Sequence, residues 1–113
     1  MSVRGRIYWY SFGSPQGIGP AKRRPVVVVQ FQSFNNSAIG TAMVASLTSR
    51  LDAAAYPGNV FLPTSATGWP KDCVARTSEL ATVDRRDLDR PVGQVPPLMM
   101  RDIDAGLRLA LDL

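Results

Sequence analysis

The residues best suited to chemistry stand directly before a proline. Residues 20–30 read PAKRRPVVVVQ, so that Lys22, Arg23 and Arg24 precede Pro25 and a run of four valines. Pro25 fixes its own backbone and donates no hydrogen bond, and a buried valine strand behind it would hold Arg24 at the end of that strand. A guanidinium held this way offers a planar set of donors that suits phosphate oxygens. The alternative is that these cations only keep a loop edge solvated.

A second candidate is Thr48, at the end of another run with strand character. Thr48 falls on the same face of this run as Val44 and Ser46. If this strand pairs with the valine strand, the Thr48 hydroxyl comes to the same end of the sheet as Arg24 or to the opposite end. The sequence leaves the register open, and threonine is also common in strands simply because it favours them.

The chain contains no histidine and one cysteine, Cys73. Ser-His-Asp and Cys-His sites, zinc sites built on imidazole and ribonucleases that use a histidine pair are therefore excluded. A single cysteine cannot form an internal disulfide and indicates a reducing compartment. We expect Cys73 to be a small buried apolar residue rather than a reactive thiol.

The charge balance permits an anionic partner. Thirteen Lys and Arg against nine Asp and Glu give a net charge of +4, and basic clusters can follow a nucleic-acid backbone. The cations suited to such a track are Lys22, Arg23, Arg50, Arg85 and Arg86. Aromatic side chains can stack on bases, with core packing as the alternative; the candidates are Tyr8, Trp9, Tyr10, Phe31, Tyr56 and Trp69.

Short strands are expected along most of the chain. Runs rich in β-branched and aromatic residues, bounded by Gly and Pro, predict strands at 6–12, 26–29, 38–49, 60–62, 73–77, 80–83 and 90–95. The valine strand has apolar residues on both faces, so it should be central. Residues 34–37 predict a turn, 63–71 a loop, and 84–88 a helical turn capped by Asp84.

One helix is expected to close the chain. After Pro96 and Pro97, helical spacing relates Met100, Ile103, Leu107 and Leu111. Gly106 within this helix is expected to mark a close packing contact. Residues 1–113 thus predict a single, mainly β domain, with a strongly bent sheet or small barrel and a C-terminal helix.

No segment has the length and apolar character of a signal peptide or a membrane span. We therefore expect a soluble, cytoplasmic protein that does not contact a membrane.

Taken in order, these blocks resemble the MazF/PemK family of toxin endoribonucleases. The resemblance covers nearly the whole chain, and its Arg-Pro block and its strand ending in threonine contain Arg24 and Thr48. The matching blocks are RGRIYWYSF, RRPVVVVQ, AMVASLTS, PGNVFLP, DCVARTSELATVDRRDL and MMRDIDAGLRLALDL.

The resemblance implies a fold, an activity and partners. The fold is an SH3-like β-barrel of the CcdB/MazF type that forms a homodimer. The activity is cleavage of single-stranded RNA at short motifs without a metal or other cofactor, giving 2′,3′-cyclic phosphate and 5′-hydroxyl ends. A cognate, MazE-like antitoxin would cover the RNA groove and neutralise the toxin.

The resemblance also assigns residues. The catalytic pair falls on Arg24 and Thr48, and RNA contacts are expected from Lys22, Arg23, Ser49, Ser78 and Glu79. Gly17, Ile18 and Gly19 depart from the family, because many members have Gly-Ser followed by Glu or Gln there; Ser14 and Gln16 lie nearby. The alternative function is a non-catalytic RNA binder, or a CcdB-like toxin that acts on a protein.

Overall fold

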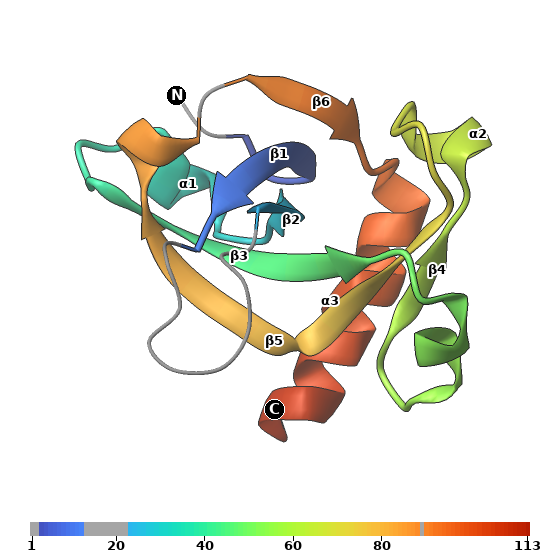
Figure 1. Cartoon of the computed structure of the whole chain (residues 1–113). Coiled ribbons are helices and arrows are strands. Elements are labelled where there is room, and N and C mark those ends of the chain that lie inside the picture. The colour runs from blue at the N-terminus through green and yellow to red at the C-terminus, as the bar shows by residue number, and fades with distance from the viewer. Residues whose placement is uncertain (1–2, 13–22, 89) are drawn as a thin grey trace, which may run out of the picture.

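A single curled antiparallel sheet forms the body of the molecule (Figure 1). The structure is a computed structural model that describes residues 3–12, 23–88 and 90–113. Its strands run in the order β4-β5-β3-β2-β1-β6, with bounds β1 Arg6–Ser11, β2 Arg23–Val28, β3 Thr41–Thr48, β4 Val60–Leu62, β5 Cys73–Asp84 and β6 Pro91–Gln94. The helices are α1 Gln32–Asn35, α2 Thr64–Thr67 and α3 Pro97–Leu111, with 3₁₀ turns η1 Leu51–Ala55 and η2 Arg85–Asp87.

The valine strand is central, as its sequence predicts. β2 lies between β1 and β3, and its valines are completely buried. Val27 belongs to one apolar cluster, with Ile7 and Ala45, whereas Val26 and Val28 belong to the cluster on the other face. Burial on both faces fixes the strand firmly, because each valine contributes about 1.5–3 kcal/mol when removed from water.

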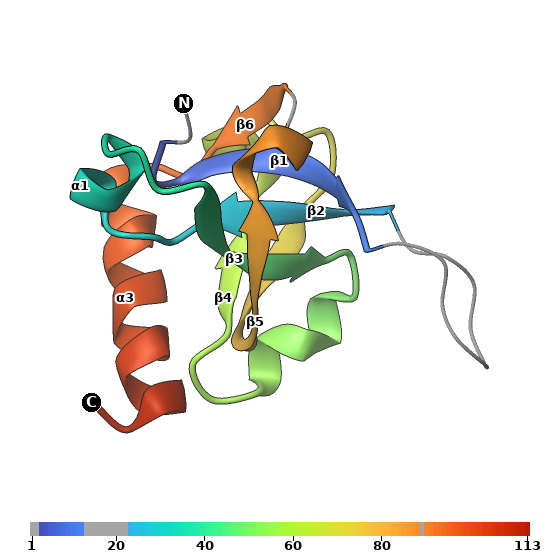
Figure 2. The ribbon, with the colours of Figure 1, turned by 90° about the vertical axis from the view of Figure 1, so that its left-hand side faces the viewer.

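Helix α3 packs against β4 and β5 (Figure 2). Met100 and Ile103 enter the core, and Gly106 is buried against Gly58. A Cβ on Gly106 would lie 2.0 Å from the Gly58 carbonyl oxygen, so the expected close contact at Gly106 is confirmed. The apolar stripe ends earlier than its spacing predicts, because Leu111 is exposed.

Two expectations about local structure were wrong. The two short strands expected at 73–77 and 80–83 are one strand, β5, interrupted by a register shift. Opposite this shift, Ala45 pairs with Leu80 and Ser46 with Arg76, so the three residues 77–79 have no partner in β3. The turn expected at 34–37 does form, because the Ser37 backbone N–H donates to the Phe34 carbonyl over 3.1 Å, and it overlaps the end of a one-turn helix, α1. The loop expected at 63–71 contains another one-turn helix, α2. A four-residue helix is too short to show a periodic pattern.

The helical turn after β5 forms as expected. The Asp84 side chain accepts a hydrogen bond from the Arg86 backbone N–H, which caps η2. Hydrogen bonds from the Arg86 side chain and backbone lower the pKa of Asp84 to about 2.

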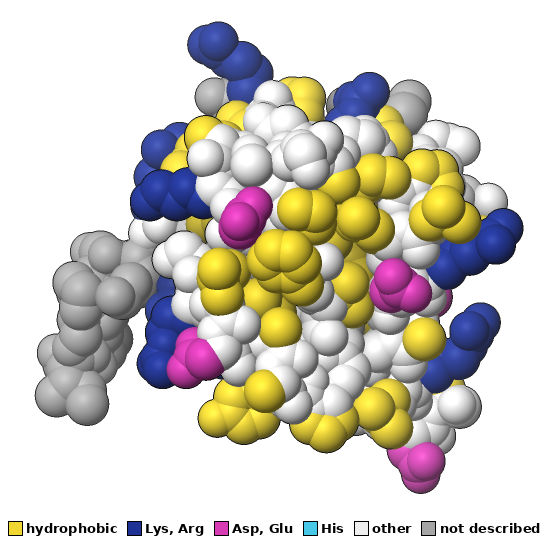
Figure 3. Space-filling view, turned by 90° about the vertical axis from the view of Figure 1, so that its right-hand side faces the viewer, with side chains coloured by type: hydrophobic (Ala, Val, Ile, Leu, Met, Phe, Trp, Pro, Cys, Tyr) yellow, Lys and Arg dark blue, Asp and Glu magenta, His cyan; other side chains and the backbone are white. Residues whose placement is uncertain are grey.

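The face formed by α2, β4 and η1 has a patch of apolar side chains at its centre (Figure 3). Exposed apolar residues in or next to these elements include Leu51, Tyr56 and Phe61. Within the described residues, no helix is both long enough and apolar enough to cross a membrane.

Candidate functional site

The register of β2 against β3 decides the relation between Arg24 and Thr48. The strands are antiparallel, and Val26 pairs with Ser46. Continuing the same register by two residues brings Arg24 opposite Thr48, and facing residues of an antiparallel pair share a face. The two candidates therefore meet at one end of the sheet, which answers the question that the sequence left open.

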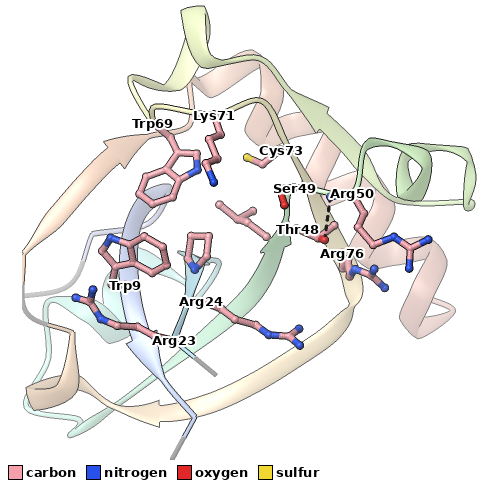
Figure 4. A pocket seen from close by; sticks show the side chains of 12 residues that line it. Trp9, Arg23, Arg24, Thr48, Ser49, Arg50, Trp69, Lys71, Cys73 and Arg76 are labelled. Atoms are coloured by element: carbon pink, nitrogen blue, oxygen red, sulfur yellow. Dashed lines mark hydrogen bonds between the residues drawn. The ribbon is translucent and has the colours of Figure 1, made fainter. Parts of the chain in front are cut away.

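Both residues line a cleft of about 470 Å³ (Figure 4). The lining contains five cations and no carboxylate. Its residues are Trp9, Arg23, Arg24, Pro25, Leu47, Thr48, Ser49, Arg50, Trp69, Lys71, Cys73 and Arg76. A concave wall with one sign of charge attracts a ligand of the opposite sign, so the cleft suits an anion.

The Arg24 backbone is held in the sheet, whereas its guanidinium makes no hydrogen bond within the described part of the protein. Its backbone pairs with Tyr10 of β1 and is followed by Pro25. The side chain is 42% exposed, and its only ion contact with a described residue is a marginal one, with Nη1 4.0 Å from Glu79 Oε1. The Arg24 donors are thus available to a ligand in the cleft.

The Thr48 hydroxyl has one hydrogen bond, and it acts there as the acceptor. The Arg50 backbone N–H donates to Thr48 Oγ1 over 3.2 Å. Because a hydroxyl has one hydrogen to donate, and no described residue accepts it, Thr48 can donate to an oxygen in the cleft.

Arg76 is a site residue that the sequence reading missed. It lies opposite Ser46 in β5 and lines the cleft. Its Nη1 donates to Glu79 Oε2 over 2.9 Å, while its Nε is buried without a hydrogen-bond partner among the described residues. The available signal was a lone cation inside the apolar stretch CVART, since a charge is rarely kept in a buried strand without a purpose.

The other residues expected to bind RNA fall into separate places. Ser49 and Arg23 line the cleft, with Arg23 Cζ 4.9 Å from the centre of the Trp9 ring. Glu79 lies between Arg24 and Arg76. Ser78 lines a neighbouring hollow, which also contains Arg50 and Arg76. Lys22 lies outside the described residues, as do the first-loop residues Ser14, Gln16, Gly17, Ile18 and Gly19.

Arg85 and Arg86 are not part of the cleft, contrary to the expected basic track. Thr41 pairs with Asp84, so these arginines follow β5 at the opposite end of β3 from Thr48. Arg85 donates to the backbone carbonyls of Asn35, Ser37 and Ile39, and Arg86 pairs with Asp84. Their charges serve local structure instead.

The aromatic candidates divide between core and surface. Tyr8 and Trp69 are buried, whereas Phe31 and Tyr56 are exposed. Trp9 is half-buried and meets Trp69 edge to face, with ring centres 4.8 Å apart.

Cys73 is buried, as expected. Burial, followed by the nearby Asp72 carboxylate, raises the pKa of its thiol to about 11. The thiol therefore stays protonated at neutral pH, and a protonated thiol is a poor nucleophile. In the part of the chain that the structure describes, no three His, Cys, Asp or Glu side chains are placed to hold a metal ion.

A small, curled antiparallel sheet with a cationic cleft at one end of its central strands is the arrangement that the fold and the site define. The chain belongs to the family described as the PemK-like, MazF-like toxin of type II toxin-antitoxin systems, whose model matches residues 3–111. Among curated proteins, it is 46% identical over 110 residues to endoribonuclease MazF6 of Mycobacterium tuberculosis, covering 97% of this chain and 96% of that protein.

Solved structures have the same fold. An endoribonuclease in complex with its cognate antitoxin from a mycobacterial species gives a TM-score of 0.82 at 21% identity, covering 100% of this chain and 97% of that one. A MazE-MazF structure from Deinococcus radiodurans gives 0.76 at 22% identity, covering 97% and 95%. At these identities, the match supports the fold alone.

Proposed function

We propose that this protein is the toxin of a type II toxin-antitoxin system and cuts single-stranded RNA at short sequence motifs. One observation supports the proposal most directly: Arg24 and Thr48, from the paired strands β2 and β3, line the same cleft, which has five cations and no carboxylate. The relative that is 46% identical is named an endoribonuclease, which supports the same activity here. RNA is an anion whose backbone fits such a surface.

RNA supplies the nucleophile for its own cleavage. The 2′-oxygen forms a bond to phosphorus, the bond from phosphorus to the 5′-oxygen breaks, and a 2′,3′-cyclic phosphate and a 5′-hydroxyl result. The enzyme has to align these atoms and stabilise the charge on the phosphate, and neither task requires a metal or a histidine.

Arg24 and Thr48 divide these tasks. Arg24 neutralises the phosphate as its negative charge grows and can give a proton to the leaving 5′-oxygen. Thr48 donates its free hydroxyl hydrogen to a nonbridging oxygen and so orients the scissile group. The 2′ proton goes to an acceptor other than Arg24, because guanidinium has no lone pair to receive it.

Two protein partners accompany this function. We propose a homodimer and a cognate, MazE-like antitoxin, since structures of similar fold include complexes with an antitoxin. An antitoxin segment that covers the cleft would block RNA access, and acidic side chains in it would complement the five cations. The RNA target places the active toxin in the cytoplasm.

The test is incubation of the purified protein with a long single-stranded RNA in EDTA. We expect cuts at a short motif with 5′-hydroxyl ends, no cuts in the Arg24→Ala variant, and no cuts where the 2′-hydroxyl before the scissile phosphate is replaced by hydrogen. Intact RNA, or equal cutting by Arg24→Ala, would refute the proposal.

The alternative, an RNA binder without catalysis or a CcdB-like toxin that acts on a protein, rests on the departure at residues 17–19. These residues lie outside the described part of the chain, and no described feature favours the alternative. Tight RNA binding without cleavage in the same assay would support it.

A further inference from the structure

The two sides of the cleft differ in chemistry. Arg24, Thr48, Arg50 and Arg76 lie on one side, and Trp9, Trp69 and Lys71 lie on the other (Figure 4). We call the second side the tryptophan end. The first side accounts for the phosphate chemistry of the proposed function, which leaves the tryptophan end without a role.

The loop that carries Trp69 is held rigidly. The Trp69 backbone N–H donates to Thr67 Oγ1 over 3.1 Å, and its carbonyl accepts from the Thr64 hydroxyl. Gly68, with φ of +74°, ends α2 in a left-handed conformation. The loop also lies directly on β6: a Cβ on Gly93 would come within 3.0 Å of the Thr67 carbonyl oxygen. These contacts fix the direction of the indole before any ligand arrives.

Trp69 presents an unpaired donor to the cleft. The residue is 5% exposed, but its indole nitrogen is not fully buried and has no acceptor among the described residues. Figure 4 shows the indole nitrogen directed into the cleft. Because this N–H faces the cleft, it is available to a ligand. A ligand oxygen at this point would accept a hydrogen bond from it.

The other polar groups at the tryptophan end are also donors. Lys71 extends into the cleft from the same loop (Figure 4) and, among the described residues, has no acceptor. An ammonium and an indole N–H donate but cannot accept. Cys73 adds only a protonated thiol, and the Asp72 carboxylate instead accepts from the Thr64 backbone N–H over 2.8 Å.

A set of donors without acceptors discriminates between nucleobases. Guanine and uracil present carbonyl oxygens on the edges where adenine and cytosine carry an amino group. An amino group would place donor against donor and leave the donors of the site without a partner, which disfavours such a ligand. Resting on the proposed function, we infer that the tryptophan end is a base subsite that selects guanine or uracil at one position of the RNA motif through Trp69 and Lys71.

The test measures binding rather than cleavage. A random library of single-stranded 2′-fluoro RNA, which lacks the nucleophile, is selected on the protein, and the bound molecules are sequenced. We expect a motif in which one position is guanine or uracil. Trp69→Phe retains an aromatic ring but has no N–H, and Lys71→Met retains a long side chain but has no donors. Each should reduce the preference at that same position about tenfold.

The controls separate donor chemistry from structure. Lys71→Arg retains the donors and should retain the preference, and Arg101→Met, which removes an exposed cation on α3, should leave the motif unchanged. Lys71 is exposed, so its variants remain informative if Trp69→Phe folds poorly. A wild-type motif without a guanine or uracil position, or a preference unchanged by both Lys71→Met and Trp69→Phe, would overturn the inference. Failure to cut ordinary RNA would refute the proposed function and leave this binding test decisive.

Discussion

The two ends of β3 place arginines in opposite situations. At the Thr48 end, Arg24 has no hydrogen-bond partner among the described residues and meets one carboxylate at 4.0 Å. At the Thr41 end, Arg85 donates to three backbone carbonyls and Arg86 pairs with Asp84. Residue type and charge are the same at both ends, and the supply of acceptors differs.

The local backbone explains this difference. Helix α1 ends at Asn35, and the last carbonyls of a helix have no partner within it. The Asn35 carbonyl and those of the following turn therefore take up the Arg85 donors, as cations near a helix end often do. At the other end, Arg24 belongs to a strand and faces a cleft lined by cations. An arginine stays available to a ligand where the surrounding chain offers no acceptor within hydrogen-bond distance.

The largest difference between the two ends of β3 is expected for substitution of Arg24. We expect Arg24→Gln to lower kcat/KM for RNA by about 10²–10³ and to leave the thermal midpoint unchanged, because the guanidinium makes no hydrogen bond within the described protein. Steady-state cleavage and thermal unfolding measure the two effects. A large loss of stability in this variant would show that Arg24 is structural after all.

The converse result is expected for Arg85. Arg85→Gln removes the donors of three carbonyls, most of which water can reach, so the free energy of unfolding should fall by about 0.5–1.5 kcal/mol. Urea unfolding measures this change, and kcat/KM per folded molecule should equal that of the wild type. Arg101→Gln serves as the control for loss of an exposed cation. If Arg85→Gln abolished cleavage without changing stability, the basic track expected from the sequence would extend to this end.

The salt dependence of RNA affinity should distinguish cations at the cleft from those at the Thr41 end of β3. Arg50 lines the cleft, and its pair with Asp52 is 72% and 70% exposed, so that pairing is weak and yields readily to a phosphate. Arg50→Gln should reduce the slope of log affinity against log salt by about one. Arg86→Gln should leave the slope unchanged. Equal slopes for the two variants would contradict the expectation that only cations at the Thr48 end of β3 contact RNA.

The smallest effect is expected from pH at the Thr41 end. The hydrogen bonds from Arg86 lower the pKa of Asp84 from 3.8 to about 2. A lowered carboxyl pKa stabilises the folded state above the unfolded pKa, and this contribution is lost as pH falls through the folded value. The thermal midpoints of wild type and Asp84→Asn should therefore differ slightly at about pH 6 and converge toward about pH 2. A constant difference over that range would contradict the assignment.

The residues that carry the site were only partly readable from the sequence. Arg24 was recognised from its place before Pro25 and a buried strand, which is local information. Arg76 was missed, because its place in the cleft depends on the pairing of β5 with β3. The role inferred for Trp69 depends on the threonine hydrogen bonds and on Gly93 of another strand, which no local pattern indicates.

The sequence by itself determined the central valine strand, the closing helix, the Asp84 cap and the position of Arg24 directly before Pro25 and a buried strand. These follow from propensity, alternation and backbone restriction between near neighbours in the chain. Only the tertiary structure decided that Arg24 meets Thr48, that β5 is one strand, and that Arg85 is bonded while Arg24 is free. These outcomes depend on strand register and on which distant carbonyls and carboxylates reach each guanidinium, and both are set when separate segments pack together.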